Sequence, residues 1–355
     1  MWSLVPFLAV TVVAIEHNAA KGNDQLRTIL LLQKQHPTKQ LIEINESGGV
    51  AKITTNVPMD LPRNIADAKL IWTGTKLYSI GGDQTVYLLG RDAVWHRTPT
   101  NLNMERHNPG VTYQPKEDLL IVCGCHNMQA DCAISCEYRD ASNDTNEWKL
   151  LYPTEGWINQ RRRLTDAAVV AHGPNVYIVG GHKNNAVSYN FETEKWTFLR
   201  DMKIERPYGA GVLVHGDTLV VCGGNFVQAT CERYDIGEDE WSMVLSDADE
   251  ITLHLSQITN QIFNIDGQSW LALGGVHKDW DVNPDVWVHQ NSYFAKNGTL
   301  QIGNKLGRIA AALVPPCLIE RNCIGNDGVH PSLDSSVVAL VIWCVVAGLS
   351  ARNGE

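Results

Sequence analysis

Arginine recurs at one position of a repeated pattern along the chain. Arg63, Arg106, Arg163 and Arg206 each stand 17 or 18 residues ahead of a recurring glycine position. A guanidinium group offers a planar fork of donors that suits a carboxylate or a sulfate, and lysine replaces it poorly. The repeated arginines therefore indicate a site for acidic groups, provided that the fold gathers them on one face. The alternative is that each arginine binds neighbouring backbone or carboxylate groups and holds the fold together.

No complete catalytic site is legible among the other reactive residue types. The 12 histidines are scattered without the spacing of metal ligands. The chain has no nucleophile elbow, zinc-protease motif, phosphate loop or dinucleotide-binding glycine pattern. We therefore expect no cofactor, no metal and no enzymatic activity.

Eight of the nine cysteines form an even set in local clusters, and the ninth, Cys344, lies in a C-terminal apolar run. Local pairs are typical of disulfides in secreted domains. Cys222 and Cys231 are nine residues apart in adjacent predicted strands, and we expect them to be bonded. The same spacing pairs Cys123 with Cys132 and leaves Cys125 for Cys136, although three pairings of these four are possible. Cys317 and Cys323 are the fourth expected pair. Zinc ligation by the first cluster is the alternative.

Three Asn-x-Ser/Thr sequons lie in predicted loops or at strand ends, where a glycan would be tolerated: Asn45, Asn143 and Asn297. Together with the cysteines they indicate the secretory pathway. A cell-surface or secreted protein is expected.

The two ends of the chain differ from the middle. Residues 1–14 contain an apolar run and are predicted to be a signal peptide, with a buried strand as the alternative. Residues 326–355 combine small residues, a polar spacer and the apolar run 337–349, an order that predicts a GPI-anchor signal. A short transmembrane helix and a soluble product are the alternatives, so the expected membrane attachment is through this tail.

Composition favours one packed domain between these ends, over residues 25–325. Hydrophobic residues make up 44% of the chain and charged residues 19%. The formal net charge of −10 argues against nucleic acid or an anionic membrane surface as a partner.

Short apolar runs that end in glycine recur through the middle of the chain. They are LYSIGG, LIVCGC, VYIVGG, LVVCGG and WLALGG, which end near Gly82, Gly124, Gly181, Gly224 and Gly275. Each is followed by an aromatic pair, seven residues apart in Tyr189 with Trp196 and in Tyr234 with Trp241. A repeat of about 40–50 residues is the signature of a repeat architecture, and the alternating apolar runs predict strands.

This order of residues resembles the kelch motif. An arginine comes first, two apolar strands follow, the glycine pair stands between the second and third strands, and tyrosine and tryptophan come last. The resemblance covers roughly residues 60–300 in five copies. It implies an all-β fold, a six-bladed β-propeller in which each copy is a four-stranded sheet. The implied blades are residues 28–56 plus 307–314, 63–100, 105–152, 162–202, 205–247 and 252–300. The strand 307–314 would close the N-terminal blade and place Arg308 at the arginine position.

The resemblance also implies that partners bind the face that carries the blade links and the loops after the glycines. That face would contain His107, His126, Asp83 and Gln84 as well as the candidate ligand-binding residues. The candidates are Arg63, Arg106, Arg163, Arg206, Tyr208, Arg308, His182, Asn184, Asn225, His277, Lys278 and Trp280. We expect an extracellular module for a protein or acidic glycan ligand. The alternative is a carbohydrate-acting or copper radical oxidase-like enzyme, or a sugar mutarotase, since some similar propellers are enzymes.

Overall fold

The computed structural model describes most of the central chain. The described residues are 27–33, 38–44, 50–55, 57, 59–60, 62–63, 67–90, 92–126, 131–153, 163–181, 183–207, 210–224, 230–244, 262–264, 270–273, 285–290, 293–299 and 309–314. Before Ile42, after Val244, at Val50 and at residues 53–55 the backbone alone is described. The expected signal peptide 1–14 and the tail 326–355 lie outside these residues.

The described strands form six four-stranded sheets in which every pairing is antiparallel. Sheet 1 has the order β24-β1-β2-β3, with bounds Ile309–Val314, Arg27–Gln33, Thr38–Ile44 and Val50–Thr55. Sheet 2 contains β4 to β7, at Ala68–Trp72, Leu77–Gly81, Val86–Leu89 and Trp95–Arg97. Sheet 3 contains β8 to β11, at Gly110–Gln114, Leu119–Cys123, Cys136–Asp140 and Lys149–Leu151.

The three remaining sheets follow the same order along the chain. Sheet 4 contains β12 to β15, at Ala168–His172, Asn175–Val179, Ala186–Asn190 and Lys195–Phe198. Sheet 5 contains β16 to β19, at Ala210–His215, Thr218–Gly223, Cys231–Asp235 and Glu240–Val244. Sheet 6 contains β20 to β23, at Ile262–Asn264, Trp270–Leu273, Asp285–Gln290 and Tyr293–Thr299.

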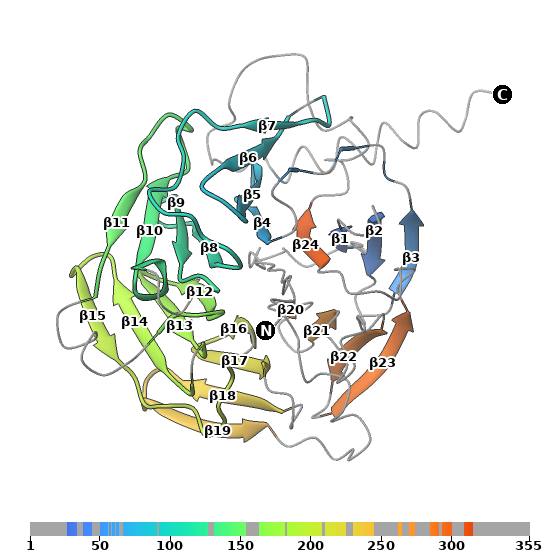
Figure 1. The fold of residues 1–355 in the computed structure, drawn as a ribbon. Coiled ribbons are helices and arrows are strands. Elements are labelled where there is room, and N and C mark those ends of the chain that lie inside the picture. Colours follow the sequence, from blue (N-terminus) through green and yellow to red (C-terminus); the bar gives the residue numbers. More distant parts are fainter. Residues whose placement is uncertain are drawn as a thin grey trace, which may run out of the picture.

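The sheets stand around a common centre, with β4, β8, β12, β16, β20 and β24 nearest to it and the fourth strand of each sheet at the rim (Figure 1). First strands of neighbouring sheets contact one another, as β4 does with β8, β8 with β12 and β12 with β16. The expected all-β class and the propeller arrangement of the sheets are confirmed. In sheet 1 the last described strand, β24, pairs with the first, β1, with Leu30 opposite Ala312.

Helical structure is scarce in the described part of the chain. Its one helical element is the short 3₁₀ turn η1, Asp131–Ile134, between β9 and β10. Among the residues that the structure describes, no helix has the length and apolar character needed to cross a bilayer.

The hydrophobic core lies between the sheets rather than inside any one of them. Ile71 and Ile80 of sheet 2 pack with Val111 and Leu120 of sheet 3, and similar clusters join sheet 3 to sheet 4 and sheet 4 to sheet 5. Inner strands are therefore buried on both faces, whereas the rim strand β15 is largely exposed. Stacking supplies the burial that a single four-stranded sheet lacks.

The glycines after the second strands lie close to the chain segments that enter the same sheet or the next one. Gly181 has φ +92, and an added Cβ there would lie 2.9 Å from the carbonyl oxygens of both Arg163 and Thr165. Gly124 has φ +70, and its added Cβ would lie 1.9 Å from the carbonyl oxygen of Leu164 in the next sheet. The recurring glycine thus serves both a left-handed backbone and a close approach between chain segments.

Candidate binding face

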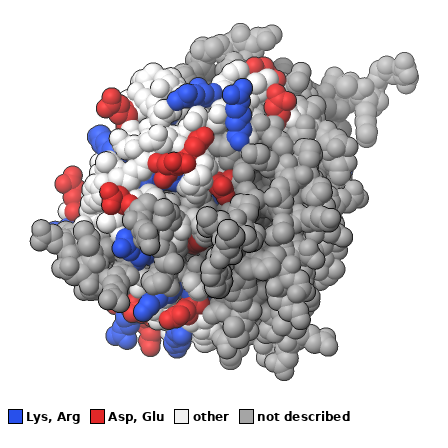
Figure 2. All heavy atoms as spheres, in the orientation of Figure 1, with Lys and Arg blue, Asp and Glu red and all other residues white. Residues whose placement is uncertain are grey.

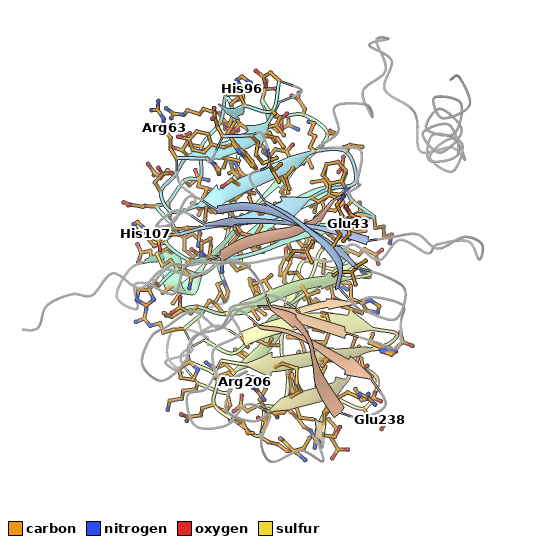
Figure 3. The ribbon with its side chains drawn as sticks, turned by 90° about the vertical axis from the view of Figure 1, so that its right-hand side faces the viewer. Glu43, Arg63, His96, His107, Arg206 and Glu238 are labelled. Atoms are coloured by element: carbon orange, nitrogen blue, oxygen red, sulfur yellow. A yellow bond between two sulfur atoms is a disulfide. The ribbon has the colours of Figure 1, made fainter. Side chains whose placement is uncertain are left out.

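One face of the molecule carries the links between successive sheets and the loops between second and third strands, and we call it the link face. Backbone hydrogen bonds join these two kinds of segment across neighbouring sheets. Gly82 N donates to Arg106 O at 2.9 Å, and Gly181 N donates to Arg206 O at 3.1 Å. Figure 3 shows Arg63, His107 and Arg206 toward this face, while Glu238 lies at the opposite one. Arg63 and Arg206, two of the sequence-predicted binding residues, thus lie toward the link face.

Arg106 lies completely buried in sheet 3, where a carboxylate and four acceptor atoms surround it. Its Nε donates to Glu137 Oε1 at 2.8 Å, and both side chains have 0% exposure. Its Nη1 donates to the carbonyl oxygens of Gly124, Cys132 and Ser135, and its Nη2 donates to Ser135 Oγ. Burial lowers the pKa of Arg106, and the charge of Glu137 opposes that shift. Such a satisfied buried pair fixes the loop between β9 and β10.

Arg206 repeats this arrangement in sheet 5. Its Nη2 donates to Glu232 Oε1 at 3.1 Å, again with 0% exposure of both side chains. Its guanidinium also donates to the carbonyl oxygens of Gly223 and Thr230. The carboxylate of Glu232 accepts the backbone N–H groups of Lys203, at 2.7 Å, and Ile204, at 3.1 Å. The arginine and its glutamate together tie the sheet to the link that precedes it.

The prediction that Arg106 and Arg206 bind an external ligand is wrong, because neither side chain reaches solvent. All three nitrogen atoms of the Arg106 guanidinium donate inside the protein. Nη1 and Nη2 of Arg206 do so as well, whereas its Nε donates to none of the described residues. Burial of a guanidinium group without a partner carries a large desolvation penalty, and hydrogen bonds to internal acceptors offset that penalty here. At these two positions the alternative structural interpretation of the motif arginine holds.

Arg63 and Arg163 occupy the same motif position but a different environment. Arg63 is exposed and Arg163 is partly exposed. Neither forms an ion pair with any of the residues that the structure describes. Arg63 is thus accessible to solvent, and Arg163 is partly accessible.

The third strand of each sheet explains the difference. Cys136 lies opposite Cys123 and Cys231 lies opposite Cys222, and the next residues are Glu137 and Glu232. In sheet 4, Ala186 lies opposite Val179, and the next residue is Val187. In sheet 2, Val86 lies opposite Ile80, and the next residue is Tyr87. Sheets 2 and 4 thus place an uncharged side chain where sheets 3 and 5 place the glutamate that binds the arginine.

Asn184 also has a partner within the protein. Its Nδ2 donates to Met202 O at 2.7 Å, and Met202 N donates back to Asn184 O at 2.8 Å. The remaining candidates lie outside the residues whose side chains the structure describes. They are Tyr208, Arg308, His182, Asn225, His277, Lys278 and Trp280.

Three disulfides are present among the described residues, and two of them join the second and third strands of sheet 3 and of sheet 5, respectively. Cys222 and Cys231 are bonded as expected, with a Cα–Cα distance of 4.1 Å. The expected pairing in the other cluster is wrong: the bonds are Cys123–Cys136 and Cys125–Cys132. Cys123 lies directly opposite Cys136 in the strand register, as Cys222 lies opposite Cys231.

The predicted pairing failed because the loops between the bonded strands differ in length. The Cys123–Cys136 separation is 13 residues and the Cys222–Cys231 separation is 9, because the longer loop of sheet 3 contains η1 and the Cys125–Cys132 bond. Cys317 and Cys323 lie outside the described residues, as do Asn45 and the side chain of Asn297.

A cluster of histidine and carboxylate side chains lies on the link face where sheets 2, 3 and 4 begin, and we call it the histidine cluster. His126 Nδ1 lies 2.7 Å from Asp166 Oδ2, and Asn108 Nδ2 donates to the same carboxylate. His107 Nε2 lies 2.7 Å from Glu105 Oε1, and its Nδ1 lies 3.5 Å from Asp67 Oδ2. Both imidazoles are about half-exposed, at 46% for His107 and 43% for His126. The cluster offers polar contacts to a ligand over three sheets.

Asp67, Asn108 and Asp166 were not anticipated as neighbours. They stand two residues before Lys69, Gly110 and Ala168, which lie opposite Ile80, Cys123 and Val179 in the register. They are thus equivalent positions of the repeat. The signal was hidden because each follows its motif arginine at a different spacing, from two residues in sheet 3 to four in sheet 2.

Acidic and basic side chains are mixed over the described part of the link face, which is turned toward the viewer in Figure 2. The predicted site for acidic groups thus cannot include Arg106 and Arg206, which are buried. Within the described residues, no group of three or more His, Cys, Asp or Glu side chains has an arrangement that could hold a metal ion.

Comparison with known families gives one match. Residues 163–203 match the model of the Kelch motif, and this segment runs from Arg163 through all four strands of sheet 4. A search of curated proteins found no match. The motif match supports the kelch-repeat assignment that the five repeats suggest.

Proposed function

We propose that this kelch-repeat propeller is a protein-binding module, not an enzyme, and that its partner binds the link face. Kelch repeats on a propeller fold suggest protein binding. The observation that carries the finer proposal is the contrast among the motif arginines. Arg106 and Arg206 are used internally, whereas Arg63 and Arg163 remain accessible on the face that the links and loops form.

The accessible arginines and the histidine cluster define the proposed contact area on sheets 2 to 4. Arginine forks bind carboxylates in two-point hydrogen bonds and are enriched in protein interfaces. The imidazoles of His107 and His126 add donors and acceptors next to them. The proposed ligand is a protein segment that brings acidic side chains to Arg63 and Arg163. Because Arg63 is exposed to solvent and Arg163 is partly exposed, binding should weaken as the salt concentration rises.

Binding is tested by capturing surface proteins from intact cells with the full chain and with variants. Arg63→Ala combined with Arg163→Ala should remove most of the captured partner, because two charge-assisted contacts are lost. Lys116→Ala removes one exposed charge from a turn on the opposite face and serves as the control. Unchanged capture by the double variant would show that the partner does not use these arginines.

The proposed location is the cell surface or the extracellular space. Three disulfides among the described residues are compatible with an oxidising compartment, where such bonds persist. The apolar run 337–349 is proposed to direct GPI anchoring. Phosphatidylinositol-specific phospholipase should then release the protein from cells. Release by detergent alone would favour a short transmembrane helix instead.

A further inference from the structure

The loop between β10 and β11 contains the Asn143 sequon and projects from the face opposite the link face. Asn143 is exposed, and its Oδ1 accepts hydrogen bonds from Thr145 N at 3.0 Å and from Thr145 Oγ1 at 2.8 Å. Among the described residues its Nδ2 donates to no acceptor. The amide nitrogen that a glycan would occupy is thus free, and the hydroxyl group of the sequon lies beside the same side chain.

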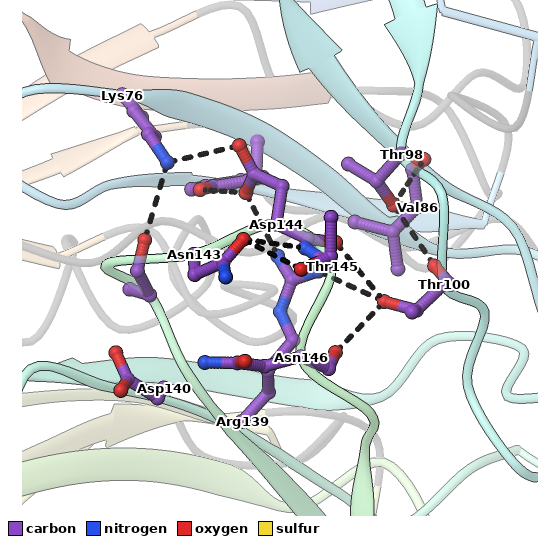
Figure 4. Close-up of polar contacts among 12 residues, drawn as sticks. Lys76, Val86, Thr98, Thr100, Arg139, Asp140, Asn143, Asp144, Thr145 and Asn146 are labelled. Atoms are coloured by element: carbon purple, nitrogen blue, oxygen red, sulfur yellow. Dashed lines mark hydrogen bonds and ion pairs between the residues drawn. The ribbon is translucent and has the colours of Figure 1, made fainter.

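The middle residue of the sequon has the opposite character. Asp144 Oδ1 accepts from Tyr78 OH at 2.6 Å and from Arg139 Nη2 at 3.3 Å, and Asp144 Oδ2 accepts from Lys76 Nζ at 2.9 Å. Thr100 Oγ1 donates to the backbone oxygen of Asp144 at 3.3 Å. Figure 4 shows this network, which holds the loop between sheets 2 and 3. The two adjacent residues therefore differ: Asp144 holds the loop in place through hydrogen bonds and ion pairs, and Asn143 is exposed to solvent.

Asn297 sits in a less open backbone context. It falls at a bulge of β23, between Lys296, which lies opposite Trp287, and Gly298, which lies opposite Val286. Its backbone is thus part of a paired strand. Of the two sequons on described backbone, Asn143 is the one that lies in a loop, and its side chain is exposed.

We infer that Asn143 carries an N-linked glycan, attached on the face opposite the proposed partner-binding face. The donor is a lipid-linked oligosaccharyl diphosphate of the secretory pathway. The bond from Asn143 Nδ2 to the anomeric carbon forms as the bond from that carbon to the diphosphate oxygen breaks. One amide proton is released, the lipid diphosphate leaves with the electron pair, and nothing is oxidised or reduced. The glycan adds a bulky polar group where no sheet packs.

The test expresses the full chain in a eukaryotic secretory host and digests it with peptide N-glycosidase, which leaves aspartate at each occupied asparagine. The peptide with residue 143 should be recovered mainly as the aspartate form. Asn143→Gln and Thr145→Ala should each increase the gel mobility by the amount expected for the loss of one glycan. Thr145→Ser should keep the wild-type mobility because serine preserves the sequon. An unmodified Asn143 in most copies, or a chain left in the cytosol without glycan, would overturn the inference.

Asp144→Ala provides a matched control, because it preserves the sequon and removes the anchor. It should keep the glycan and lower the thermal midpoint, whereas Asn143→Gln should lose the glycan with nearly the wild-type midpoint. Ligand capture by Asn143→Gln should equal that of the wild type, since the glycan lies away from the link face. Loss of the glycan in Asp144→Ala together with its retention in Asn143→Gln would contradict the assignment.

Discussion

Sheets 3 and 5 differ from sheets 2 and 4 at the same positions of the same repeat. In sheets 3 and 5 a disulfide joins the second and third strands, and the next residue is a glutamate that binds the buried motif arginine. In sheets 2 and 4 apolar residues replace the cysteines, and Tyr87 or Val187 replaces the glutamate. The motif arginine is exposed in sheet 2 and partly exposed in sheet 4. The disulfide and the ion pair therefore occur together or not at all in these four sheets.

The role of a repeated arginine therefore depends on one residue in the third strand of the same sheet. When that residue is a glutamate, it forms a buried ion pair with the arginine, and we call this pair the clamp. The clamp holds a loop and a link against the sheet. Without the glutamate, burial of the guanidinium would leave its charge uncompensated, and the side chain stays in water. One motif position thus yields two structural residues and two candidate ligand-binding residues.

The largest effect is expected when the clamp of sheet 3 is broken. Glu137→Ala leaves Arg106 buried without its carboxylate and should lower the free energy of unfolding by about 3–5 kcal/mol. Urea unfolding would measure this loss. Replacing both partners, with Arg106→Met and Glu137→Leu, should recover much of it because no charge remains buried. A double variant as unstable as the single one would show that the arginine contacts with Gly124, Cys132 and Ser135 matter more than the ion pair.

Removing a cross-strand disulfide should have the next largest effect. Cys123→Ala with Cys136→Ala, or Cys222→Ala with Cys231→Ala, opens a short loop in the unfolded chain and should cost about 3 kcal/mol. Thermal unfolding with and without reductant would measure it. Peptide mapping without reduction checks the premise, since free thiols at these positions would remove the distinction between the two kinds of sheet.

A glutamate introduced into the third strand of sheet 4 should make this sheet resemble sheets 3 and 5. Val187→Glu places a carboxylate at the position that Glu137 and Glu232 occupy, and Arg163 should turn inward to bind it. A double-mutant cycle with Arg163→Ala should show a favourable coupling of about 0.5–3 kcal/mol in unfolding free energy. Ligand capture should fall in Val187→Glu. Zero coupling would mean that the third-strand residue does not decide where the arginine lies.

The smallest effect at neutral pH concerns two tyrosine–aspartate pairs, one between sheets 2 and 3 and one within sheet 5. Burial raises the pKa of Tyr78 in sheet 2 and of Tyr234 in sheet 5, and hydrogen bonds to Asp144 and Asp239 raise it further. The folded state therefore keeps these protons to a higher pH than the unfolded chain does. Their contribution to stability is complete below about pH 10, the ordinary tyrosine value, and is lost as the pH rises toward the folded-state pKa.

Thermal midpoints measured between neutral and strongly alkaline pH would test this effect. The midpoint of the wild type should fall above about pH 10. Tyr78→Phe and Tyr234→Phe should each flatten that fall, and to a similar extent, because the pairs do not depend on the disulfide or the glutamate. A response confined to one variant would show that the two kinds of sheet also differ in their tyrosines.

Local features of the sequence were sufficient to predict the strands and the class of fold. The glycines that follow the second strands, the tyrosine and tryptophan of the outer strands, and the alternation of apolar residues act over a few neighbours. Tyr234 and Trp241, for example, are directly opposite each other in β18 and β19, with ring centroids 4.9 Å apart. Such signals survive changes in loop length because each belongs to one hairpin.

Only the tertiary structure decided which residues the repeats bring together. Arg106 and Glu137 are 31 residues apart in the sequence, and Arg206 and Glu232 are 26 apart, with loops of different length between them. Equal spacing in the sequence therefore did not mean equal position, as the cysteines of sheet 3 show. The strand register sets position, and the register places a carboxylate beside two of the motif arginines and an apolar or aromatic residue at that position for the other two. Burial of charge then follows from whether a partner is present, which no single stretch of sequence reveals.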